Sequence, residues 1–127
     1  MFSSTSTEII TSHRLSHRVY LSLEMIHSSF KNKNLSAKTL KRGCEIHDNN
    51  FSSVFRREVG MTIKDYIEHL RIETACALLG EGSMTAVDVG YAVGYEHIQT
   101  FYRAFRRRMA CTPRQYQQKL SGKDADC

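Results

Sequence analysis

Apolar residues recur every three or four positions along most of this 127-residue chain. Such spacing places side chains on one face of a helix, whereas a half-buried strand alternates apolar and polar residues. No run of strand length alternates strictly, and Pro113 is the only proline. The pattern therefore predicts an all-α fold of amphipathic helices, each of which buries one face.

About seven helices are expected from the apolar spacing and from residues that begin or end helices. They span 15–31, 37–42, 49–58, 63–79, 85–93 and 98–108, and a last helix begins near residue 112. Asp48 and Thr112 are expected to cap the helices that follow them, with Pro113 in the first turn of the last helix. Gly60 and Gly94 are expected to end helices in a left-handed conformation.

The chain repeats itself at an offset of fifty residues. Each copy is predicted to contain a short helix, a turn, a second helix with the sequence Phe-x-x-x-Phe-Arg-Arg, and a threonine before another helix. The identical pairs are His47/His97, Phe51/Phe101, Phe55/Phe105, Arg56/Arg106, Arg57/Arg107, Thr62/Thr112 and Tyr66/Tyr116. Two copies predict a tandem pair of helix-turn-helix units.

The second helix of each copy has the features of a helix that reads DNA: an apolar face, outward polar side chains, and arginines near its end. The outward positions are Asn49, Asn50, Ser52, Ser53, Arg56 and Arg57 in the first copy, and Ile98, Gln99, Tyr102, Arg103, Arg106 and Arg107 in the second. Asn and Gln can pair with adenine, Arg with guanine, and an aliphatic group with the thymine methyl. An ordinary solvated helix face has a similar composition. The repetition of the same scaffold favours DNA reading.

The net charge of +5 and a pI near 9.2 are consistent with a polyanionic partner. The four cysteines are scattered and form no zinc-finger or disulfide pattern, so reduced thiols in a cytoplasm fit best. His13 and His17 have the i, i+4 spacing of metal ligands but no evident third ligand, and Cys111 and Cys127 are weak candidates for redox sensing. No catalytic set, cofactor motif, signal peptide or membrane-spanning run is evident.

The residues of both copies resemble the DNA-binding domain of the AraC/XylS family. The first copy carries the stretch 55–60, followed by Tyr66-Ile67 and Leu70-Arg71. The second copy is the more specific match, with Val87, Val89, Gly94-Tyr95, Phe101, Arg103, Phe105-Arg106-Arg107, Thr112-Pro113 and Tyr116 at the spacing of the family signature. The resemblance covers about residues 19–118.

The resemblance implies two homeodomain-like helix-turn-helix subdomains joined by a long central helix. On this chain the first subdomain would span 13–62, the joining helix 63–79 and the second subdomain 80–120, between a flexible polar tail at 1–12 and a tail at 121–127. Each subdomain would send one helix into the major groove on one face of double-stranded DNA, about one turn or roughly 34 Å apart. The implied function is a monomeric, sequence-specific transcription regulator of the bacterial cytoplasm, more an activator that contacts RNA polymerase than a repressor, and not an enzyme.

Carried over by position, the resemblance implies DNA contacts in both copies. The base-contacting candidates are Asn49, Asn50, Ser52, Ser53, Ile98, Gln99, Thr100 and Arg103, and the phosphate-contacting candidates are Arg56, Arg57, Arg106, Arg107 and Arg114. Two positions depart from the family pattern. Ser53 stands where many relatives carry arginine, and Ala110 stands where a glycine equivalent to Gly60 is usual.

Two alternatives remain open from the sequence. The chain could be an interaction module that uses this fold to hold a protein partner, with only nonspecific affinity for DNA. It could also be the DNA-binding part of a larger ligand-sensing regulator, which the polar start of the chain does not exclude. A footprint on a defined DNA sequence would separate the first alternative from specific regulation.

Overall fold

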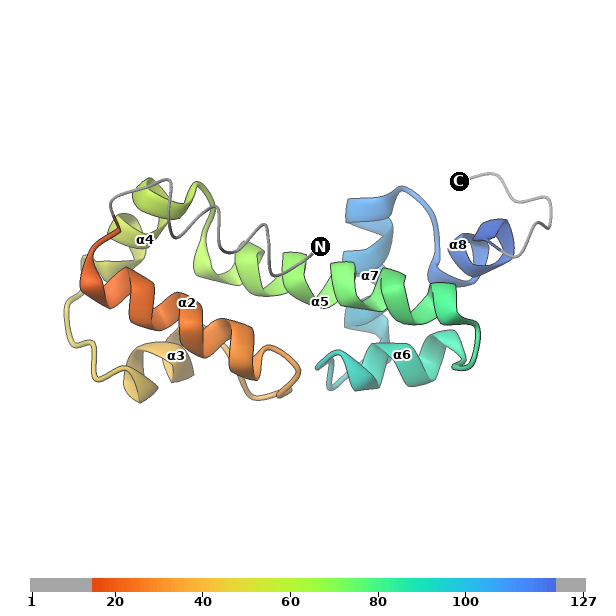
Figure 1. The fold of residues 1–127 in the computed structure, drawn as a ribbon, viewed down its shortest axis with the longest axis horizontal. Helices are drawn as coiled ribbons and strands as arrows, with labels where there is room; N and C mark the ends of the chain where they lie inside the picture. Colours follow the sequence, from red (N-terminus) through yellow and green to blue (C-terminus); the bar gives the residue numbers. More distant parts are fainter. Residues whose placement is uncertain (1–14, 121–127) are drawn as a thin grey trace. The chain divides into compact units, whose positions relative to one another are not determined.

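The computed structural model describes residues 15–120, where α-helices are the regular secondary structure (Figure 1). The helices are α2 (His17–Ser29), α3 (Ala37–Gly43), α4 (Phe51–Val59), α5 (Ile63–Glu81), α6 (Ala86–Ala92), α7 (Ile98–Met109) and α8 (Pro113–Leu120). The all-α fold class is confirmed, and every expected helix is present with its ends shifted by at most two residues. Across these seven helices, none has the length and apolar character needed to cross a bilayer. The predicted tails, 1–12 and 121–127, lie outside the described residues.

The described residues divide into two compact units. The first unit comprises residues 15–29 and Leu35–Ile67, and the second comprises Phe30–Asn34 and residues 68–120. In the first unit α2 packs against α3 and α4, and in the second unit α7 packs against α6 and α8. Helix α5 begins in the first unit and ends in the second, so the chain passes from one to the other within a helix.

The fifty-residue repeat reappears in the two cores. The four phenylalanines of the repeat are fully buried: Phe51, Phe55, Phe101 and Phe105. Within each pair the rings meet edge to face, with centroids 6.2 Å apart in the first unit and 5.8 Å apart in the second. The second ring of each pair meets a tyrosine from a later helix, Tyr66 at 6.2 Å and Tyr116 at 5.7 Å. Each unit therefore orients its Phe-x-x-x-Phe helix by the same aromatic contacts.

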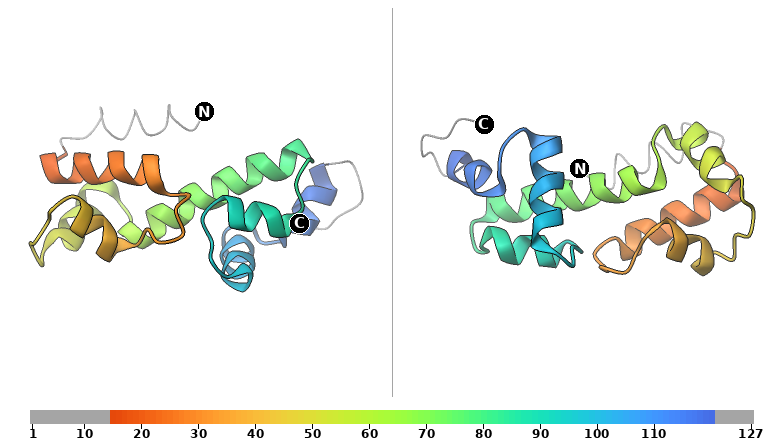
Figure 2. Two further views of the ribbon diagram at one scale, coloured as in Figure 1. Left: turned by 90° about the horizontal axis from the view of Figure 1, so that it is seen from below. Right: turned by 180° about the vertical axis from the view of Figure 1, so that it is seen from behind.

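The second unit has one continuous core that joins α5, α6 and α7. Ile72 and Leu79 from α5 pack with Val89 from α6 and with the two phenylalanines of α7. Figure 2 shows the same arrangement from two further sides, with α6 and α7 beside the C-terminal half of α5. Gly90 makes this packing possible, because a Cβ atom there would lie 2.6 Å from the Phe101 ring. The close approach of α6 to α7 thus depends on a glycine.

Most of the expected helix ends are confirmed. Gly60 and Gly94 are left-handed, with φ of 98° and 115°. Thr112 caps α8, since its Oγ1 accepts a hydrogen bond from the Gln115 backbone N–H at 3.1 Å, and the Gln115 side chain in turn accepts one from the Thr112 N–H at 2.9 Å. Pro113 is the first residue of α8, where its missing N–H costs nothing.

The expected cap of α4 is wrong. The helix begins at Phe51 rather than at residue 49, and its N-cap residue is Asn50, whose side chain makes no capping hydrogen bond. Asp48 instead accepts a hydrogen bond from the Asn50 backbone N–H at 2.8 Å. Because an aspartate side chain readily bonds the backbone two residues later, it closes a turn here before the helix starts.

Ala110, the counterpart of Gly60 in the second copy, has a left-handed backbone conformation. Its φ is 64°, it follows α7 as Gly60 follows α4, and its backbone N–H donates to the Arg106 carbonyl at 2.9 Å. An alanine in this conformation costs about 1 kcal/mol relative to glycine. Helix α7 therefore ends in the same left-handed conformation as α4, despite the cost of an alanine at this position.

Candidate nucleic-acid interface

Helix α4 presents a short polar surface. Phe51 and Phe55 hold one face in the core, while Ser52 and Ser53 are exposed on the helix and Asn49 precedes it on the surface. Arg56 and Arg57 are exposed in the last turn. All six first-copy candidates are therefore solvent-accessible, although Asn49 and Asn50 lie in the turn before α4 and not on the helix as expected.

Helix α7 has the larger exposed side chains. Gln99, Thr100 and Arg103 are exposed, as the sequence suggested. Ile98 and Tyr102 are half-buried instead of fully outward. Both pack against the core of the second unit. The absence of a side chain at Gly90 leaves room for Ile98, and the centre of the Tyr102 ring lies 5.9 Å from the centre of the Phe101 ring. In the first half of α7, the exposed hydrogen-bonding side chains are thus those of Gln99, Thr100 and Arg103.

The arginines at the end of α7 differ in their partners. Arg107 and Arg108 both bind the carboxylate of Glu68, and the contact from Arg108 Nε to Glu68 Oε1 is 2.7 Å. Arg103 and Arg106 are exposed and pair with no carboxylate within residues 15–120. An arginine held by a carboxylate has less to gain from a phosphate. Arg106 is therefore more available than Arg107 for an external anion.

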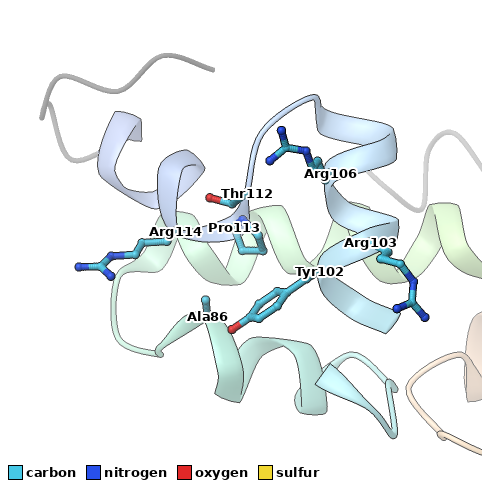
Figure 3. A pocket seen from close by; sticks show the side chains of 7 residues that line it. All are labelled: Ala86, Tyr102, Arg103, Arg106, Thr112, Pro113 and Arg114. Carbon is cyan, nitrogen blue, oxygen red and sulfur yellow. The ribbon is translucent and has the colours of Figure 1, made fainter. Parts of the chain in front are cut away.

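A hollow of about 340 Å³ lies where α7, α8 and the start of α6 meet (Figure 3). It is lined by Ala86, Tyr102, Arg103, Arg106, Thr112, Pro113 and Arg114. Figure 3 shows Arg103 and Arg106 on α7 at one side and Arg114 on α8 at the other, around an apolar floor that includes Pro113 and the Tyr102 ring. Apolar groups, including the aliphatic stems of the arginines, make up most of the lining, and Figure 3 shows the guanidinium groups of Arg103 and Arg114 pointing away from the hollow. The hollow itself is therefore mainly apolar.

Arg71 connects the turn that follows α2 with the turn that leads into α7. Its guanidinium donates to the backbone carbonyls of Phe30 at 2.7 Å and Asn32 at 2.9 Å, and it lies 5.3 Å from the centre of the Tyr95 ring. Burial raises the pKa of Tyr95 to about 12, so this ring is neutral at physiological pH. The sequence motif that contains Arg71 does not reveal this role, and no motif points to Glu68, because the partners of both residues lie about forty residues away in the chain.

The described residues show no group of three or more potential metal ligands. His17 is exposed on α2, whereas His13 lies outside the described residues, so their pairing is not part of this structure. Cys111 is buried and Cys127 also lies outside the described range.

Known proteins share both the sequence pattern and the fold. The sequence profile of a helix-turn-helix domain matches residues 42–119, which is more than half of the chain. The chain belongs to the AraC-type helix-turn-helix family. The family and the fold are those of DNA-binding transcription regulators rather than of enzymes. The resemblance proposed from the sequence motifs is thus confirmed.

Individual relatives agree with this assignment. The AraC-type chain is 31% identical over 107 residues to the HTH-type transcriptional regulator YobQ of Bacillus subtilis, a match that covers 84% of this chain and 44% of that protein. It is 34% identical over 89 residues to the F1 operon positive regulatory protein of Yersinia pestis, covering 66% and 30%. The chain spans less than half the length of these curated relatives.

A solved structure shows the same fold. The C-terminal domain of AraT, a response regulator from Geobacillus stearothermophilus, superposes with a TM-score of 0.79 at 24% sequence identity. The match covers 84% of this chain and 88% of that domain. The two helix-turn-helix units therefore form the architecture of an AraC-type DNA-binding domain.

Proposed function

We propose that the AraC-type chain is a sequence-specific transcription regulator. Helices α4 and α7 enter two successive segments of the major groove, and each helix contacts the bases of one segment. One observation carries the proposal: both helices bury a Phe-x-x-x-Phe face and expose polar side chains followed by arginines. The proposed base contacts are Asn49, Asn50, Ser52, Ser53, Gln99, Thr100 and Arg103, with Ile98 contributing its exposed edge. The proposed phosphate contacts are Arg56, Arg57, Arg106 and Arg114, and Arg107 to a smaller extent.

We further infer that the regulator activates transcription through a contact with RNA polymerase, in the bacterial cytoplasm at nucleoid DNA. A named relative, the F1 operon positive regulatory protein, is a positive regulator, which supports this direction. Two reading helices in one chain do the work that usually needs a dimer, so a monomer suffices. No cofactor enters this mechanism.

We expect the two units to differ in how strongly they discriminate between bases. Arg103 on α7 can bond guanine with two hydrogen bonds and discriminate by about 1 to 3 kcal/mol, whereas the hydroxyl of Ser53 on α4 pairs with several bases. Arg103→Ala should therefore relax base preference at one position, and Ser53→Ala should change affinity little. Selection from a randomised DNA pool with the parent and with each variant measures both effects.

Two outcomes would contradict this reading asymmetry: equal information in both half-sites, or a larger loss of specificity from Ser53→Ala than from Arg103→Ala. A parent protein that enriches no DNA motif would contradict sequence-specific regulation itself. That result would favour a protein-interaction module with nonspecific DNA affinity.

The arginines of α7 should differ in their contribution to salt dependence. Arg106→Ala should weaken binding to all sequences alike and lower the slope of log K against log salt by about 0.9, the value for one phosphate contact. Arg107→Ala is the matched control, because it removes the same charge from the next residue but a side chain already bound to Glu68. Its slope should change less. A change of base preference with an intact slope in Arg106→Ala would show that its assigned role is wrong.

A further inference from the structure

A second hollow, of about 550 Å³, lies in the first unit and has a basic lining. The residues that line it are Ala37, Lys38, Lys41, Arg42, Ile46, His47 and Ser52. None of them carries a carboxylate, and three carry a permanent cation at neutral pH. Ser52 belongs to the exposed face of α4, so the hollow borders the helix that is proposed to read DNA in this unit.

The three cations of α3, which we call the α3 basic face (Lys38, Lys41 and Arg42), have no ion-pair partner within residues 15–120. Lys38 and Arg42 are exposed and Lys41 is half-buried. The pKa of the Asp48 carboxyl lies below its usual value. The main cause is the hydrogen bond from the Asn50 backbone N–H, followed by Arg18, and the charge of Lys41 makes a smaller contribution.

The carboxylate of Asp48 does not neutralise this face. It already pairs with Arg18 at 3.2 Å and accepts the Asn50 N–H at 2.8 Å. Asp48 thus offsets the positive charge of the α3 basic face only in part, at Lys41. The three like charges lie at i, i+3 and i+4 on one helix and repel one another, so the arrangement favours an external anion.

The internal repeat shows that the fold does not require these cations. Helix α6 is the counterpart of α3, since each has seven residues and starts after a hydroxyl cap, Thr85 for α6 and Ser36 for α3. At the positions of Lys38, Lys41 and Arg42, α6 holds Val87, Gly90 and Tyr91. Both helices precede the Phe-x-x-x-Phe helix of their unit. One copy is therefore strongly basic where the other has three uncharged residues. Val87 and Tyr91 are exposed, as Lys38 and Arg42 are, so packing does not explain the difference at these two positions.

We propose that the α3 basic face binds the sugar-phosphate backbone of DNA and gives the first unit an affinity that does not depend on base sequence. This inference rests on the proposed function in that the ligand is duplex DNA. It also accounts for the small side chains on α4: a unit anchored by backbone phosphates needs few selective base contacts. The first unit then supplies affinity, and the second supplies most of the selectivity.

The test measures binding of the full chain to two fluorescently labelled duplexes, one selected from a randomised pool and one scrambled, across a series of KCl concentrations. The variant is Lys38→Ala/Arg42→Ala, which alters two exposed side chains. The matched control is Lys33→Ala/Lys119→Ala, which removes the same charge from two other exposed positions. The exchange Lys38→Arg/Arg42→Lys keeps the charge and separates electrostatics from packing. Circular dichroism confirms that each protein is folded.

The slope of log K against log salt should fall by about 1.8 in Lys38→Ala/Arg42→Ala, because two phosphate contacts of about 0.9 each are lost. The ratio of affinities for the two duplexes should stay as in the parent, and the control and the charge-keeping exchange should retain the parent slope. A slope unchanged from the parent, an equal loss in the control, or an altered ratio between the duplexes would overturn the proposal.

Failure of this inference can be told apart from failure of the proposed function. A parent that does not distinguish the two duplexes contradicts sequence-specific regulation, while the comparison of slopes still decides the role of α3. A parent that prefers the selected duplex, together with an unchanged slope in the variant, contradicts the α3 inference alone. A parent with no affinity for duplex DNA contradicts both.

Discussion

Replacing Leu70 by alanine should lower the free energy of unfolding by about 2 to 5 kcal/mol. Leu70 lies in the middle of α5 and is only 2% exposed. Truncation removes buried methyl groups and leaves a cavity that the surrounding packed helices fill only in part. Urea or thermal unfolding followed by circular dichroism measures the loss.

Lys64→Ala on the same helix is the control for the Leu70 variant. Lys64 is exposed and forms no ion pair with another described residue, so its replacement should change stability by no more than about 0.5 kcal/mol. If Leu70→Ala were as stable as the parent, the side chain would not be buried, and the orientation of α5 about its axis would be wrong.

Gly94→Ala should destabilise the second unit by about 2 to 4 kcal/mol, since two costs of about 1 and about 1 to 3 kcal/mol add. The first is conformational, because φ at this residue is 115°. The second is steric: the new Cβ would lie 2.6 Å from the Phe30 carbonyl oxygen and 2.8 Å from Arg71 Nε. Those two atoms form a 2.7 Å hydrogen bond with each other, so neither can move aside without loss.

Gly60→Ala separates the two costs. Gly60 is also left-handed, with φ of 98°, but an added Cβ there meets no atom within 4 Å. Its replacement should cost only the conformational part, about 1 kcal/mol. Comparing the two alanine variants by urea unfolding gives the steric part as a difference. Equal losses would mean that the Phe30 carbonyl and Arg71 do not crowd Gly94.

Much of the helical framework was predictable, because it depends on residues close together in the chain. The period of three to four residues located all seven helices of the described range to within two residues at each end. Gly60, Gly94 and Thr112 were recognised because a left-handed turn or a capping hydroxyl acts within one helical turn. Asp48 was misjudged because a turn and a cap compete for the same carboxylate.

The duplicated pattern was also predictable from the residues alone, and with it the two surfaces that are candidates for DNA contact. A Phe-x-x-x-Phe spacing fixes which side of a helix faces the core, and the opposite side must then carry the exposed residues. That reasoning gave the exposed positions of Ser52, Ser53, Gln99 and Arg103 correctly. It placed Ile98 too far outward, because the room for its side chain comes from Gly90 on another helix.

Which charged groups already have a partner follows from the packing of distant segments and not from the sequence. Glu68 binds Arg107 and Arg108 across about forty residues of sequence, while Arg106, the residue before them, pairs with no carboxylate in the described range. The α3 basic face likewise became visible once Asp48 was seen to bind Arg18. The periodicity of one helix carries no information about the partner that packing brings from a distant helix, and that partner determines whether a cation can accept a phosphate.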